Sequence, residues 1–123
     1  MGTLNNILIA LVALLHLWFM YVEMFAWETT GRKVFRKNLQ GDLFKPTKVL
    51  AANQGLYNGF LAAGLFWCVY IGDELWKVNL SVFFLSCVTV AGIYGALTVD
   101  KKIFFIQALP AVIALILTIV LSV

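Results

Sequence analysis

The sequence predicts an all-α membrane protein with four transmembrane helices in an up-down antiparallel bundle. Composition is the first indication: of the 123 residues, 63% are hydrophobic and only 12% are charged, whereas an average soluble domain has about 25% charged residues. The second is the grouping of the apolar residues into four long segments. Because each span needs about 20 residues, we expect one integral membrane domain over residues 1–123 and no separate soluble catalytic domain.

The four predicted spans follow one another with short polar connections. They are residues 4–26, 49–72, 79–99 and 103–123. The first connection, residues 27–48, contains Gly31, Gly41 and Pro46 among basic residues, which is typical of a loop at a membrane surface. The other two connections are very short and therefore join antiparallel neighbours. The first span has no Lys or Arg before it, so we expect a permanent span and not a cleaved signal peptide.

The cations indicate an orientation. Loop one (residues 27–48) and loop three (residues 100–102) hold eight of the nine Lys and Arg residues, and Lys77 is the ninth. Because Lys and Arg resist translocation, we expect both loops in the cytoplasm and both termini outside. The cluster Arg32-Lys33 and Arg36-Lys37 is explained by this topology and by contact with anionic headgroups. Membrane lipid is therefore an expected partner, and nucleic acid is not.

Two ionisable side chains lie inside the first predicted span. His16 and Glu23 are seven residues apart, and seven steps of about 100° place them on one face of a helix. An ionisable group inside a bilayer costs roughly 2.5 to 3.5 kcal/mol on insertion scales, so it faces a bundle interior and has a partner or a function. His16 and Glu23 are therefore the candidate catalytic pair, if the protein is an enzyme.

The second span has two different faces. One side carries the polar residues Asn53, Gln54, Tyr57 and Asn58. The opposite side carries Gly55 and Gly59, and small residues let membrane helices approach closely. Gly92 and Gly95 in the third span form a matching surface, so we expect these two spans to pack together. The same small-residue faces would also serve a homo-oligomer.

Counting 1.5 Å per residue from the loop-one side places polar groups from all four spans in the same half of the membrane. The outer half has almost none, and Pro110 should leave the carbonyl of Ile106 free beside this layer. We therefore predict an intramembrane polar pocket that opens to the cytoplasm. Its candidate ligand-binding residues are His16, Glu23, Trp27, Asn53, Gln54, Tyr57, Asn58, Tyr94 and Gln107.

Each candidate has a structural alternative. Polar side chains in membrane helices also fix helix register, and a tryptophan at the end of a span, such as Trp27, is usually an interfacial anchor. Because an isolated carboxylate in hydrocarbon is costly, we expect Glu23 to bond to the second span near Asn53 or Gln54. No metal site is expected from one His and one Glu, and no cofactor is expected.

Two blocks of the sequence resemble a known family. The blocks are His16-Leu17-Trp18-Phe19-Met20-Tyr21-Val22-Glu23-Met24-Phe25-Ala26-Trp27 and the run from Lys48 to Gly64 that contains Ala51-Ala52-Asn53-Gln54-Gly55-Leu56-Tyr57-Asn58-Gly59. The chain resembles a bacterial family of small four-span membrane proteins catalogued as domain of unknown function 1304. The resemblance implies the four-span architecture and a bacterial cytoplasmic membrane, and it implies no activity.

Three function classes follow from the polar layer. The first is binding or transport of a small amphipathic or cationic molecule, with Glu23 as counter-charge and His16 as proton relay. The second is an acid–base isomerase or epimerase acting on a lipid-soluble substrate. The third is an interaction subunit that binds another membrane protein through its small-residue faces. We rank binding or transport first, and the identity of the ligand is left open.

Overall fold

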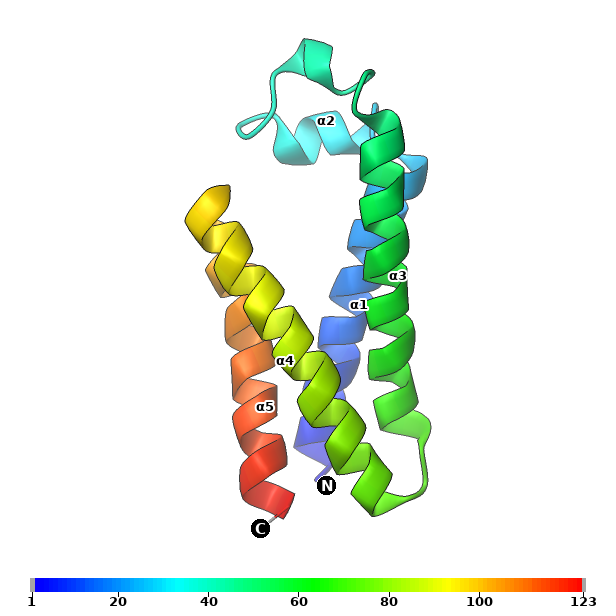
Figure 1. Cartoon of the computed structure of the whole chain (residues 1–123), viewed down its shortest axis with the longest axis vertical. Coiled ribbons are helices and arrows are strands. Elements are labelled where there is room, and N and C mark those ends of the chain that lie inside the picture. Colours follow the sequence, from blue (N-terminus) through cyan, green and yellow to red (C-terminus); the bar gives the residue numbers. More distant parts are fainter. Residues whose placement is uncertain (1, 123) are drawn as a thin grey trace.

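The computed structural model describes residues 2–122, which form helices and short connections without any strand. The long helices are α1 (Thr3–Phe25), α3 (Lys48–Tyr70), α4 (Glu74–Thr98) and α5 (Leu109–Ser122), and a π-helical turn, η2 (Phe104–Ala108), leads into α5 (Figure 1). Two short helices, α2 (Thr30–Phe35) and η1 (Gly41–Leu43), lie within loop one.

Three helical stretches are long and apolar enough to cross a membrane. They are Thr3–Phe25, Glu74–Thr98 and Phe104–Ser122. Helix α3 is also 23 residues long, but its polar residues near the loop-one end lower its hydropathy, and it is not among the three. The chain is therefore all-helical with three candidate membrane-spanning helices.

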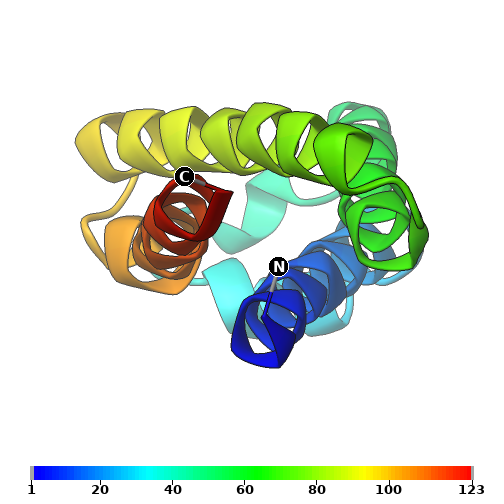
Figure 2. The same ribbon diagram turned by 90° about the horizontal axis from the view of Figure 1, so that it is seen from below.

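The helices form two pairs. Helix α1 runs beside α3, and α4 runs beside α5 (Figure 1). Figure 2, viewed from the end that holds both chain ends, shows α4 strongly inclined: it begins next to α3 and finishes next to η2. The two pairs are thus closest near the chain ends and diverge toward loop one, which lies across the other end. We call this the loop-one end.

The apolar core lies where the two pairs are in contact. Its fully buried residues come from all four long helices: Ile9, Val12, Ala13, Leu65, Cys68, Leu85, Val88, Ala111 and Ala114. Several of these side chains are small, which lets the helices approach closely. Burial of this cluster fixes the position of α1 relative to α5, and this position matters for the polar contacts described below.

The glycines pack against different partners from those expected. A Cβ on Gly55 would lie 2.7 Å from Cγ of Met24 and 3.0 Å from Cβ of Glu23, so the small face of α3 lies on α1. On α4, a Cβ at Gly92 would lie 2.7 Å from the backbone nitrogen of Ala108. Gly55 and Gly92 therefore do not face each other, and each lies against the partner helix within its own pair. The second and third predicted spans do pack together, as expected, but through Gly64 of α3, which lies against the ring of Phe84 on α4.

Helix α4 begins at Glu74, five residues before the predicted start of the third span. The carboxylate of Asp73 accepts a hydrogen bond of 3.0 Å from the backbone N–H of Trp76, which is an N-cap. Lys77, predicted to lie in a loop, is a helical residue that is 8% exposed. Its ammonium donates to the carbonyl of Val69, 3.3 Å away, at the C-terminal end of α3. The cation is tolerated because it bonds to an otherwise unpaired helix-end carbonyl.

The π-helical turn before α5 follows from Pro110. Proline has no N–H, so the α-helical bond from residue 110 to the carbonyl of Ile106 cannot form. The backbone N–H of Leu109 bonds instead to the carbonyl of Phe104, five residues back. The wider turn contains Gln107, and it lies beside the close contact of Ala108 with Gly92. Pro110 was expected to leave the carbonyl of Ile106 free, and the π-helical turn is the change in hydrogen bonding that accompanies this proline.

Candidate functional site

His16 forms a buried polar contact between α1 and the π-helical turn. Its side chain is completely buried. Nδ1 lies 2.8 Å from the carbonyl of Val12, and Nε2 lies 3.0 Å from Nε2 of Gln107. Because a carbonyl can only accept, Nδ1 carries the proton, and the amide of Gln107 donates to the lone pair of Nε2. His16 is therefore a neutral imidazole with both nitrogens engaged.

Glu23 forms the second buried contact, between α1 and α3. Its side chain is 4% exposed, and the amide of Asn58 donates to Oε1 over 2.5 Å. The expected partner helix is correct, but the expected partners Asn53 and Gln54 are not. Helix α3 extends past the end of α1 (Figure 1), so Gly55 lies opposite Glu23 and the amide one turn deeper reaches it.

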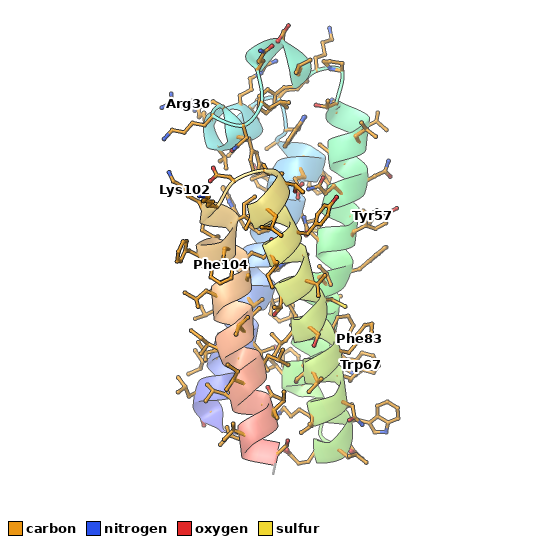
Figure 3. The ribbon with its side chains drawn as sticks, turned by 60° about the vertical axis from the view of Figure 1, so that its left-hand side comes forward. Arg36, Tyr57, Trp67, Phe83, Lys102 and Phe104 are labelled. Atoms are coloured by element: carbon orange, nitrogen blue, oxygen red, sulfur yellow. The ribbon has the colours of Figure 1, made fainter. Side chains whose placement is uncertain are left out.

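Four other predicted site residues point outward. Asn53 and Gln54 are exposed, Tyr57 is 62% exposed and Tyr94 is 68% exposed. Figure 3 shows Tyr57 on the outer side of α3. The structure thus gathers His16 with Gln107 and Glu23 with Asn58, and it leaves the other four on the surface. Within residues 2–122 no hydrogen bond joins the two gathered pairs.

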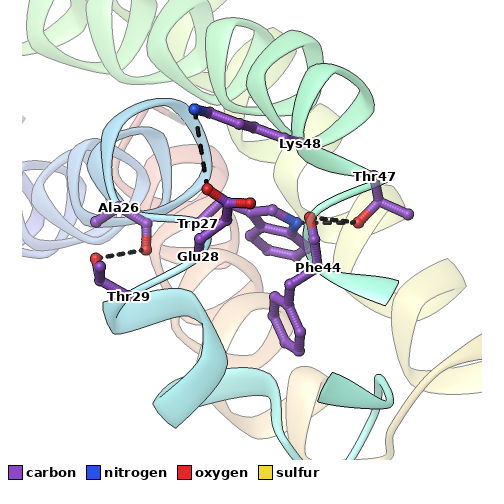
Figure 4. A network of polar contacts seen from close by, with 7 residues as sticks. All are labelled: Ala26, Trp27, Glu28, Thr29, Phe44, Thr47 and Lys48. Carbon is purple, nitrogen blue, oxygen red and sulfur yellow. Dashed lines mark hydrogen bonds and ion pairs between the residues drawn. The ribbon is translucent and has the colours of Figure 1, made fainter. Parts of the chain in front are cut away.

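Trp27 belongs to a compact cluster of contacting side chains within loop one. Its indole N–H donates to Oγ1 of Thr47 over 3.0 Å, and its ring lies 5.1 Å from that of Phe44 (Figure 4). Phe44 is 1% exposed, and the guanidinium of Arg32 lies 5.3 Å from its ring centre. The Lys48 ammonium also reaches Glu28, at 4.0 Å. Trp27 therefore anchors loop one, which is more ordered than a purely solvated loop.

Loop one also contacts loop three. The amide of Asn38 donates to Oδ2 of Asp100 over 3.3 Å, and the backbone N–H of Lys102 donates to Oδ1 over 3.0 Å. The Lys102 N–H, followed by the Asn38 amide, holds the pKa of the Asp100 carboxyl below its usual range. These bonds place both basic loops at one end of the bundle.

A second group of buried polar residues lies near the chain ends, where the sequence indicated almost none. The amide of Asn5 donates to Oγ1 of Thr118 over 2.8 Å, which joins α1 to α5. Ser81 is fully buried, and so is Thr118. The signal in the sequence was weak because Ser and Thr hydroxyls bond to carbonyls of their own helix, as Thr118 does to Ala114, and so are common in membrane helices.

Two surface hollows lie away from the buried pairs. One is between the start of α4 and the end of α5, and the other is between the end of α4 and η2. Neither is lined by His16 or Glu23. Among the described residues, no group of three His, Cys, Asp or Glu side chains is arranged to hold a metal ion. Cys68 and Cys87 are free thiols.

Comparison with known proteins identifies one matching family and one similar protein, and neither has an assigned function. The model of a family described as "Protein of unknown function (DUF1304)" matches residues 10–119. A protein of Lactococcus lactis subsp. lactis (strain IL1403), named "Uncharacterized protein YpaA", is 32% identical over 117 residues, which are 94% of this chain and 97% of that protein. No solved structure matches the chain significantly.

Proposed function

The chain belongs to the DUF1304 family, and from the geometry of its buried polar pairs we propose that it binds or transports a small amphipathic molecule with a cationic group, at Glu23. The chain would span the bacterial cytoplasmic membrane four times as an up-down bundle, with α3 as the remaining span. Loops one and three would face the cytoplasm because they carry eight of the nine cations.

One observation carries the proposed function. Glu23 is a buried carboxyl whose hydrogen-bond partner is a neutral amide. Within residues 2–122 no cation lies at salt-bridge distance from it, and Oε2 accepts no hydrogen bond. A buried carboxylate is normally paired with a cation, because burial without one is costly. A cationic ligand or a proton would supply the missing charge.

The position of Glu23 supports a site at the loop-one end. The two helix pairs diverge toward this end, and loop one lies across it (Figure 1). Val22 on α1 and Ala26, the C-cap residue of that helix, are buried, whereas Asn58 is half-buried. His16 lies about two helical turns deeper than Glu23, so a ligand bound at Glu23 would affect His16 through α1 and not by direct contact.

The test uses tetraphenylphosphonium, a lipophilic cation, as the probe. Equilibrium dialysis of the purified protein in detergent should show saturable binding that weakens at low pH, because protonation neutralises the carboxylate. Glu23→Gln should lower the affinity at least about tenfold, which is ~1.4 kcal/mol. Its thermal stability should not change, because the amide oxygen still accepts from Asn58.

Asp42→Asn is the matched control, because Asp42 is an exposed carboxylate of loop one. This variant should bind the probe as the wild type does. Equal binding of the probe by the wild type and by Glu23→Gln would show that Glu23 does not bind the cation. The contact with Asn58 would then only fix the register of α1 against α3.

The outer face of α3 favours a second candidate function, an interaction subunit. Asn53, Gln54 and Tyr57 are exposed on this helix, and polar groups turned toward lipid are costly. A partner helix, from another copy or another membrane protein, would cover them. Native mass spectrometry of the wild type and of Gln54→Leu should then show an assembly that the variant weakens, and a monomer in both cases would argue against this function.

The acid–base enzyme is not proposed. Such an enzyme needs His16 and Glu23 to act on one substrate. Both nitrogens of His16 are engaged by Val12 and Gln107, while Glu23 is bonded to Asn58 on another helix. No observation favours their convergence on one substrate atom.

A further inference from the structure

The groove between the end of α4 and the π-helical turn is apolar along its length and basic at its mouth. It has a volume of about 520 Å³ and is lined by Ile93, Ala96, Leu97, Lys101, Phe104 and Phe105. Leu97 and Phe105 are largely exposed, so the groove faces outward and away from Glu23. Its size falls within the roughly 300 to 1,000 Å³ of small-molecule sites.

The mouth of the groove has unpaired positive charge. Among the described residues no carboxylate lies at salt-bridge distance from Lys101 or Lys102. The nearby carboxylate of Asp100 is already engaged by the Lys102 backbone N–H and the Asn38 amide. The Asn38 contact brings loop one, with Lys37, to the same place, and Figure 3 shows Arg36 and Lys102 at this end with Phe104 below them. Cations therefore outnumber the single carboxylate.

We propose that this groove binds an anionic phospholipid of the surrounding bilayer, with an acyl chain against Ile93, Leu97 and Phe105 and the phosphate at Lys101. Ile93 lies about 7.5 Å along α4 before its last residue, Thr98, and Lys101 follows in the connection to η2, so the apolar part lies at acyl-chain depth when the loop lies at the headgroups. This site is independent of Glu23. It requires only that the membrane surface lies at the loop-one end, on either side of the membrane.

Native mass spectrometry of the delipidated protein, with phosphatidylglycerol or phosphatidylcholine added, tests this site. The wild type should retain one phosphatidylglycerol in preference to phosphatidylcholine. Lys101→Gln should reduce that preference about fivefold, the effect of one cation near anionic lipid. The matched control is Lys45→Gln, which removes an exposed cation of loop one outside the groove and should keep the preference. Equal loss in both variants would mean a diffuse charge effect and would overturn the site.

A second variant fills the groove. Ala96→Trp places a large side chain among the lining residues and should abolish retention of either lipid. Its control, Ile116→Trp, introduces the same side chain at an exposed position of α5 and should retain lipid. Thermal unfolding verifies that both variants are folded. Retention of lipid by the folded Ala96→Trp variant would contradict the proposal. The proposal would also be contradicted if the wild type formed a dimer and no lipid complex, and Ala96→Trp dissociated that dimer.

Discussion

At the scale of single residues, the buried polar groups act in pairs, and each pair joins two helices. His16 with Gln107 joins α1 to the π-helical turn, and Glu23 with Asn58 joins α1 to α3. The sequence placed all four side chains in one membrane layer, because depth follows directly from position in a helix. It did not reveal the pairing, because the relative offset of two helices depends on the packing between them, as at Gly55 against Glu23.

The His16–Gln107 contact predicts strongly coupled substitutions. Gln107→Leu leaves Nε2 of a fully buried imidazole without a partner, which should lower the free energy of unfolding by about 1–3 kcal/mol. His16→Leu should have a similar effect. The double variant removes both polar groups, so its loss should be smaller than the sum of the two single losses by about 1 kcal/mol. Denaturant titration in detergent measures all three, and simple additivity would show that the two side chains do not interact.

At the scale of elements, the packing contact between α4 and the π-helical turn leaves the least room for an added side chain. A Cβ at Gly92 would meet the backbone nitrogen of Ala108 at 2.7 Å, and backbone cannot rotate away as a side chain can. The π-helical turn itself could be expected from Pro110, which removes a helical donor. Its contact with Gly92 could not, because a pattern of small residues fits several helix partners equally well.

Gly92→Ala should therefore destabilise the protein. Alanine is the better helix former by about 1 kcal/mol, but the steric clash should outweigh this gain and give a net loss of about 1–3 kcal/mol. Gly72→Ala is the control, because a Cβ there meets nothing within 4 Å, and its effect should be within about 0.5 kcal/mol. The two unfolding midpoints, measured in the same detergent, separate the outcomes. A Gly92→Ala variant as stable as Gly72→Ala would mean that α4 and the π-helical turn are not closely packed at Gly92.

At the scale of the whole molecule, composition and segment length predicted the helices, because an apolar run of about 20 residues has few alternatives in a membrane. The ends of the helices were less predictable: Asp73 begins α4 early, and Lys77 is buried against Val69. Helix α3 is the ambiguous element. Its inner face is made of small residues and its outer face is partly polar, so its average hydropathy does not show whether it spans the membrane.

Single-cysteine labelling on both sides of α3 resolves this ambiguity. Gly41 lies in loop one and Gly72 lies after the other end of α3, and both are exposed. A Cβ at either position meets no heavy atom closer than 3.6 Å, so Gly41→Cys and Gly72→Cys should fold once Cys68 and Cys87 are replaced by alanine. In intact cells, a membrane-impermeant maleimide should label Gly72→Cys and not Gly41→Cys, because Lys and Arg resist translocation and loop one carries six of the nine cations, which predicts a cytoplasmic loop one. Permeabilised cells, in which both positions should react, provide the control. Labelling of both positions from the same side would show that α3 does not cross the membrane, and labelling of Gly41→Cys alone would reverse the orientation.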